Sequence, residues 1–138
     1  MKIKSVAHVC IKTTNLELTA EFYCGVLGME KVFNFTRKGS VIGFYLKAAG
    51  ETFVEVFEVG EARNEENPVL SHICLLTDDI KGLHQRISER GLNPGKLSMG
   101  ADNSYQFWMC DPNGMAIEFQ EYTGKSSQFT GQDVEATW

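Results

Sequence analysis

Two short segments decide the fold: AHVCIK at residues 7–12 and SHICLL at residues 71–76. Each places a histidine and a cysteine two positions apart in a run of apolar and β-branched residues without Gly or Pro, which is typical of a strand. The two segments lie 64 positions apart in a chain of 138 residues. The sequence therefore predicts two copies of one module.

A helix is predicted after each of these strands. Thr14 followed by Glu17 has the pattern of a capping box, and residues 78–79 offer an aspartate at the equivalent place in the second copy. Apolar residues then recur at helical spacing, and a glycine stands where each helix would end in a left-handed residue. The apolar residues are Leu16, Ala20, Tyr23 and Leu27, then Ile80, Leu83 and Ile87, and the glycines are Gly28 and Gly91.

Three strands are predicted after each helix, so that each half is a strand, a helix and three strands. They lie near 30–36, 41–47 and 52–58 in the first half and near 95–99, 104–110 and 115–122 in the second. The turns between them, at 38–39, 49–50 and 112–114, contain glycine. The predicted fold class is α+β, with two βαβββ modules.

We expect a single domain over residues 1–122. Module one spans 3–59, a polar linker spans 60–69, and module two spans 70–122. Residues 123–138 are polar and are interpreted as an extended arm or a loose tail. The terminal Trp138 indicates that this tail docks, on a partner subunit for example, although a frayed end fits equally well.

Charge and composition exclude several classes of partner. The net charge is −5 and no basic run is longer than two residues, which argues against nucleic acids and anionic membranes. No apolar run approaches the roughly 20 residues of a membrane span, and no signal peptide is evident, so a cytoplasmic protein is expected. The four cysteines form no C-x-x-C pair and are expected to be reduced and buried.

Four polar side chains interrupt apolar strands at matching positions. Glu55 lies 47 positions after His8, and Glu118 lies 46 positions after His72. A carboxylate in an apolar strand is costly to bury unless it is paired or binds a metal. Singly, each residue reads as an ordinary strand histidine or a solvent-facing glutamate. Together, the repeated spacing predicts a site for one divalent ion of Zn, Ni, Co, Mn or Fe, whereas the mid-helix His84 is expected at the surface.

The sequence resembles the vicinal oxygen chelate superfamily, which includes glyoxalase I, extradiol dioxygenases, methylmalonyl-CoA epimerase and fosfomycin-resistance proteins. The resemblance covers residues 3–122 and is carried by the segments HVCIK, AEFYCGVLGM, SHICL and DPNGMAIEF. It implies that the modules form a half-open barrel around the metal site. It also implies a homodimer that acts on a small-molecule substrate.

The four candidate ligands match the His or Gln, Glu, His and Glu of glyoxalase I-like members. The resemblance therefore implies a metal-dependent lyase or isomerase, in which a glutamate moves a proton between adjacent carbons. Glu118 is the expected base and Glu55 the alternative. By the same resemblance Lys12, Gln106 and Trp108 are expected to contact substrate. Strand alternation puts Lys12 on the face of His8, together with Cys10, and puts Cys74 on the face of His72.

The use of glutathione stays open. Lys12 keeps one of the positive charges that glyoxalase I uses for glutathione carboxylates, but the loop at 98–104 contains Asp102 and no Lys or Arg. An acidic residue there would repel such a carboxylate. An Fe- or Mn-dependent dioxygenase, an epimerase and a non-enzymatic drug-binding resistance protein remain alternatives.

Overall fold

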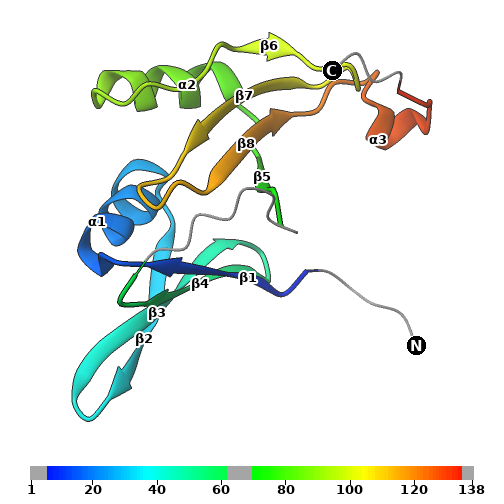
Figure 1. The fold of residues 1–138 in the computed structure, drawn as a ribbon. Helices are drawn as coiled ribbons and strands as arrows, with labels where there is room; N and C mark the ends of the chain where they lie inside the picture. The colour runs from blue at the N-terminus through cyan, green and yellow to red at the C-terminus, as the bar shows by residue number, and fades with distance from the viewer. Residues whose placement is uncertain (1–5, 62–69, 135–138) are drawn as a thin grey trace, which may run out of the picture. The chain divides into compact units, whose positions relative to one another are not determined.

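The computed structural model describes residues 6–61 and 70–134 (Figure 1). The chain divides into two compact units, residues 1–66 and 67–138, which are called module one and module two below. Each contains one four-stranded sheet. The α+β fold of two βαβββ modules is confirmed.

Module one has four strands, a short α-helix and a π-helix that continues it. They are β1 (His8–Thr13), α1 (Leu16–Ala20), η1 (Glu21–Val26), β2 (Glu30–Arg37), β3 (Ser40–Ala49) and β4 (Thr52–Glu58). The strand order is β1-β4-β3-β2, with β1 parallel to β4 and the other neighbours antiparallel. The parallel pair brings the first and last strands together, which places the two ends of the repeat side by side.

Module two repeats this topology. Its elements are β5 (His72–Leu76), α2 (Ile80–Glu89), β6 (Ser98–Met99), β7 (Tyr105–Cys110), β8 (Ala116–Glu121) and α3 (Ser127–Thr130). The order is β5-β8-β7-β6, again with the first and last strands of the repeat parallel. The strand predicted at 95–99 is shorter than expected, because only Ser98 and Met99 pair with β7.

The helix ends follow the predicted chemistry with one correction. The prediction of Thr14 as N-cap was wrong by one residue: the side chain of Asn15 accepts a hydrogen bond from the Leu18 amide at 2.9 Å. In module two the predicted aspartate cap is present, since Asp79 accepts from the Gly82 amide. The two glycines after the helices have φ of +76° and +77°, as a left-handed helix end requires.

Each sheet has one buried face and one open face. In module one the buried face is apolar and comprises Ile11, Phe44, Leu46, Val54 and Val56. In module two it comprises Ile73, Phe107, Ile117 and Phe119, and the buried Ile80 and Ile87 of α2 add to this core. The side chains with the opposite strand parity occupy the open faces, and these include all four candidate metal ligands.

The expectation that His84 lies at the surface was wrong. Its side chain is half-buried, its Nε2 lies 2.9 Å from the Gly95 carbonyl oxygen, and its ring meets the Phe107 ring edge-on at 5.1 Å. This histidine therefore ties α2 to the loop before β6 and to the core.

The C-terminal segment is neither extended nor loose in its described part. The Ser127 amide donates to the Asp102 carbonyl at 2.8 Å, and the hydroxyls of Thr123 and Ser126 donate to the Asn103 carbonyl. Figure 1 shows α3 beside the connection between β6 and β7. Hydrogen bonds of Thr123, Ser126 and Ser127 thus attach this segment to the rest of module two, while Trp138 lies outside the described residues.

All four cysteines are free, but the expectation that they are buried was wrong. Cys10, Cys74 and Cys110 are exposed and Cys24 is half-buried. Cys10 and Cys74 lie two positions after a strand histidine, so they share its open face. In the described part of the chain, no helix has the length and apolar character needed to cross a membrane.

Candidate functional site

Each module brings one histidine and one glutamate together on its open face. His8 Nε2 lies 3.9 Å from Glu55 Oε2, and His72 Nε2 lies 3.6 Å from Glu118 Oε2. The register of the parallel strands explains this proximity. Cys10 stands opposite Glu55, and Cys74 stands opposite Glu118. Each histidine lies two residues before that cysteine and therefore on the same face of the sheet as the glutamate.

An aromatic residue completes each pair. Tyr45 stands opposite Glu55, and Trp108 stands opposite Glu118. The Tyr45 ring lies 5.8 Å from the His8 ring, and the Trp108 ring lies 4.8 Å from the His72 ring, both edge-on. The internal repeat therefore extends to a constellation of His, Cys, Glu and an aromatic ring in each module.

The two cysteines in this constellation are neutral thiols. Partial burial raises the pKa of Cys10 to about 11, helped by a hydrogen bond with Glu55 and by its negative charge. Burial, together with the charge and a hydrogen bond of Glu118, raises the pKa of Cys74 to about 12. The thiolate is the nucleophilic form of cysteine, so the burial and the neighbouring carboxylates keep both thiols unreactive near neutral pH.

Glu118 is the more enclosed of the two carboxylates. It is 8% exposed, and its Oε1 accepts a hydrogen bond from Gln120 Nε2 at 3.0 Å. The adjacent His72 places its Nδ1 2.8 Å from the hydroxyl oxygen of Ser71, which leaves Nε2 on the side of Glu118. Such supporting hydrogen bonds orient metal-binding side chains and fix the tautomer of the imidazole.

A pocket of about 460 Å³ opens beside the pair in module two. It contains the predicted substrate residues Gln106 and Trp108 together with His72 and Glu118. Its remaining described lining residues are Ala101, Asp102, Gln120 and Val134. The sequence analysis missed Gln120 as a site residue, although Gln120 shares the strand parity of Glu118 and is similarly polar in an apolar strand.

The open face of module one carries an aromatic cluster, formed by Phe33, Phe35, Tyr45, Phe53 and Phe57. Tyr45 lies between the rings of Phe33 and Phe53, stacked at 4.9 Å and 5.0 Å respectively. Phe35 packs on Phe57 at 4.6 Å. Because Phe53 and Phe57 share the strand parity of Glu55, an aromatic surface of stacked and edge-on rings lies on the same face as the His8–Glu55 pair.

Lys12 lies on the same face of β1 as His8 and is exposed. Four residues along a strand correspond to about 13 Å, so Lys12 is well separated from His8. Its charge acts on Cys10, whose pKa it lowers slightly against the larger raising effects. Lys12 therefore lies near the end of β1, on the same face as the His8–Glu55 pair but distant from His8.

The donor set fits a borderline divalent ion. Two ligands at about 2.1 Å from one ion lie roughly 3.0–3.4 Å apart, and the His–Glu separations of 3.9 Å and 3.6 Å are somewhat longer than this. Neither separation is short enough for a hydrogen bond within the pair. Among the described residues no group of three or more His, Cys, Asp or Glu side chains is arranged to hold a metal ion, so each module by itself offers one His–Glu pair of donors.

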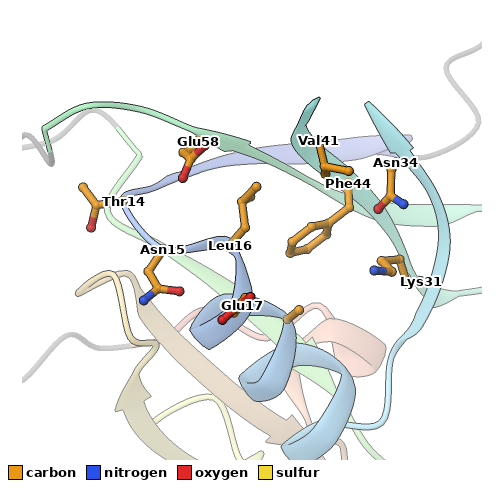
Figure 2. Close-up of a pocket in the computed structure, with 10 residues that line it drawn as sticks. Thr14, Asn15, Leu16, Glu17, Lys31, Asn34, Val41, Phe44 and Glu58 are labelled. Atoms are coloured by element: carbon orange, nitrogen blue, oxygen red, sulfur yellow. The ribbon is translucent and has the colours of Figure 1, made fainter. Parts of the chain in front are cut away.

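A second hollow in module one has different chemistry (Figure 2). It measures about 540 Å³ and lies between α1 and the sheet, and its lining includes Leu16 from α1, Phe44 from β3, and the charged residues Glu17, Lys31 and Glu58. Phe44 has the strand parity opposite to that of Tyr45 and Glu55, so this hollow is on the other face of the sheet. Its described lining includes no His or Cys, and it is not the candidate metal site.

A family model matches residues 5–119 of the chain: the Glyoxalase/Bleomycin resistance protein/Dioxygenase superfamily. The match extends over both modules and both His–Glu pairs.

Solved structures resemble the chain at low sequence identity. A glyoxalase family protein from Enterococcus faecalis has a TM-score of 0.75 at 23% identity, covering 88% of this chain and 100% of that one. Lactoylglutathione lyase from Agrobacterium tumefaciens has a TM-score of 0.69 at 20% identity, covering 91% and 97%. TnmS3, an antibiotic-binding protein from a Streptomyces species, has a TM-score of 0.70 at 18% identity, covering 89% and 99%. At these identities the likeness shows the shared fold alone.

Proposed function

Because the chain belongs to the Glyoxalase/Bleomycin resistance protein/Dioxygenase superfamily, we propose that it is a divalent-metal-dependent lyase or isomerase acting on a small substrate with vicinal oxygens. The observation that carries the proposal is the repeated His–Glu pair, at 3.9 Å in module one and 3.6 Å in module two. His8, Glu55, His72 and Glu118 would hold the ion. When bound, the ion supplies Lewis-acid polarisation of two adjacent substrate oxygens.

Glu118 is our choice for the base. It is enclosed, it adjoins the pocket of module two, and the amide of Gln120 fixes its orientation. In the proposed isomerisation Glu118 takes the proton from the hydroxyl-bearing carbon next to a carbonyl and returns it to the carbonyl carbon, while the hydroxyl proton passes to the former carbonyl oxygen, so that the C–OH and C=O groups exchange places. The C–H bond that breaks is replaced by a new one, and the carboxylate is regenerated. Glu55, with its side chain 19% exposed, is the alternative base.

The remaining residues bind and orient substrate in this proposal. Gln106 and Trp108 line the pocket and contact the bound molecule directly. Lys12 meets a distal acidic group on the face of module one. We propose that the protein acts as a homodimer in the cytoplasm, as the superfamily commonly does.

Proton exchange in D₂O tests the reaction class without requiring a known product. Protein loaded with Zn²⁺, Ni²⁺, Co²⁺, Mn²⁺ or Fe²⁺ is incubated with methylglyoxal and glutathione, and with other α-hydroxy carbonyl compounds. We expect metal-dependent loss of the α-proton signal by NMR, reduced about 10²–10⁴-fold in Glu118→Gln. Glu89→Gln, which removes an exposed carboxylate from α2, is the matched control. Absence of bound metal and of exchange with all five ions would refute the proposal.

The aromatic cluster of module one supports a second candidate, a non-enzymatic protein that binds flat apolar drugs. The Tyr45 ring of this cluster lies 5.8 Å from the His8 ring, and Phe33, which stacks on Tyr45, is 45% exposed. Stacking of a planar ligand on such a surface needs no metal. Tight drug binding that survives EDTA, without proton exchange, would favour this function. Oxygen consumption with catechols and Fe²⁺ would instead indicate a dioxygenase.

A further inference from the structure

The side chains that line the pocket of module two carry negative charge without a positive partner among them. Its described lining contains two carboxylates, Asp102 and Glu118, and no Lys or Arg. Glu118 is a candidate metal ligand, and a bound dication would use its charge. Asp102 is then the one negative side chain of this lining that remains for an organic ligand.

Asp102 is held in place by the C-terminal segment. Its Oδ2 accepts hydrogen bonds from Gln128 Nε2 at 2.6 Å and from the Ser104 hydroxyl at 2.9 Å, and its Oδ1 accepts from the Ser104 amide at 3.1 Å. Burial tends to raise the pKa of Asp102, but these hydrogen bonds outweigh it and lower the pKa below its ordinary value. The group is therefore ionised and rigid.

The carboxylate keeps its negative charge for a ligand at the lining of the pocket. Ser104, Gln128 and the backbone amide of Asp102 itself donate to its oxygens, and an ion pair with an organic cation depends on the charge rather than on a free acceptor direction. A Cβ built on Gly100 would lie 2.7 Å from both Asp102 Oδ1 and Gln106 Oε1. Glycine at this position thus lets two acceptor oxygens approach the same point of the loop, at the wall of the pocket.

Trp108 adds an aromatic surface to the same pocket. It is 38% exposed, and its contact with His72 is edge-on. A carboxylate and an accessible indole in one cavity are the two elements that recognise an organic cation, through an ion pair and a cation–π contact. Burial raises the pKa of Tyr122 first, and the negative charges of Asp102 and Glu118 raise it further.

We propose that the pocket of module two binds an ammonium or amidinium group of the substrate between Asp102 and Trp108. The inference rests on the proposed small-molecule function of this face and narrows its substrate class to organic cations. The same carboxylate disfavours an anionic group such as a glutathione carboxylate in this pocket. The C-terminal segment is thereby part of substrate selection, because Gln128 fixes the selecting carboxylate.

Three planar probes of equal size and different charge test the proposal: benzamidine, benzamide and benzoate. Each is titrated into the ¹⁵N-labelled full chain with EDTA present, and the indole N–H signal of Trp108 is followed by NMR. We expect benzamidine to bind about tenfold more tightly than benzamide, and benzoate more weakly than either. Added salt should reduce the preference for benzamidine.

Asp102→Asn should remove the preference for benzamidine while leaving benzamide affinity unchanged. The matched control is Asp78→Asn, which removes an exposed carboxylate of the same module and should preserve the preference. Equal binding of the three probes, tighter binding of benzoate, or no response of Trp108 to any probe overturns the proposal, whether or not the Asn variant folds. Because the titration is metal-free, these results are independent of the metal-dependent assay of the proposed function.

Discussion

Gln120 is the residue on which the geometry of Glu118 depends. Its amide donates to Glu118 Oε1 in a site where both residues are 8% exposed. Gln120→Leu keeps the volume but leaves the carboxylate without this donor. We expect the free energy of unfolding to fall by about 1–3 kcal/mol and the dissociation constant for Zn²⁺ to rise about 10–100-fold. Chemical denaturation and competition with a chromophoric chelator measure the two effects.

Gln85→Leu is the control for that substitution. Gln85 is exposed on α2 and donates a hydrogen bond to Glu89. Gln85→Leu therefore removes the same amide group and the same kind of hydrogen bond, but at a position that is in contact with water. Its effect on stability should stay within about 0.5 kcal/mol, with unchanged Zn²⁺ affinity. A Gln120→Leu protein that binds Zn²⁺ like its parent would contradict the role given to this amide.

At the scale of single residues, spacing located the His–Glu pairs, because a repeat places equivalent side chains on equivalent strands. The supporting partners were harder to find. Gln120 could have been predicted as a site residue, because it shares the strand parity of Glu118. The contact of Ser71 with His72 Nδ1 could not, because it depends on a side-chain rotamer. The contact between Asp102 and Gln128 joins positions 26 apart, and no periodicity connects them.

The start of α1 gives a test at the scale of an element. Thr14 and Asn15 are both good capping residues, but only Asn15 bonds to the Leu18 amide. Asn15→Ala should lower the free energy of unfolding by about 1 kcal/mol, and Thr14→Ala by less than about 0.5 kcal/mol. Urea denaturation of the two variants makes the comparison. A larger loss in Thr14→Ala would mean that the capping box begins one residue earlier than the structure has it.

The attachment of α3 depends on one buried hydroxyl. Ser126 Oγ accepts from the Thr123 amide at 2.8 Å, lies 3.0 Å from the Ser104 hydroxyl and donates to the Asn103 carbonyl at 3.1 Å. Ser126→Ala removes the hydrogen bonds with Thr123 and Asn103 and the contact with the Ser104 hydroxyl. Amide hydrogen exchange over 123–130 should accelerate at least about tenfold, the equivalent of about 1.4 kcal/mol of local stability.

The neighbouring Ser127→Ala should leave that exchange unchanged, because Ser127 contacts Asp102 through its backbone amide. Equal exchange in the two variants would show that the hydroxyl of Ser126 does not hold the segment.

The presence of the strands and helices could be predicted from the alternation of apolar and polar residues and from the helical spacing of apolar residues. Most strand bounds lie within two residues of those predicted. Two features of the structure were not predicted from the sequence. Apolar spacing does not distinguish an α-helix from the π-helix at Glu21–Val26, since both keep one apolar side. The polar composition of 123–134 gave no sign of attachment, because the hydrogen bonds that hold it come from a distant loop.

At the scale of the whole molecule, the repeat bears on how many metal ions the chain binds and how tightly it binds them. A His–Glu pair alone supplies two protein donors, whereas a tightly bound borderline ion usually has three or four. If one ion uses a pair from each kind of module, the chain binds one ion tightly, and the two histidines are equivalent. If each pair acts alone, the chain binds two ions weakly and independently.

We expect the first behaviour. His8→Ala and His72→Ala should each weaken Ni²⁺ or Zn²⁺ binding by at least about 100-fold, beyond the cost of losing a supporting hydrogen bond. The double variant should be little worse than either single one, because the ligands of one site act as a unit. Isothermal titration gives both stoichiometry and affinity. His84→Ala removes a histidine bonded to Gly95 and packed on Phe107, so it should lower stability without changing stoichiometry. A single substitution that removes half of the bound metal and leaves the other half intact would show that the two modules bind ions separately.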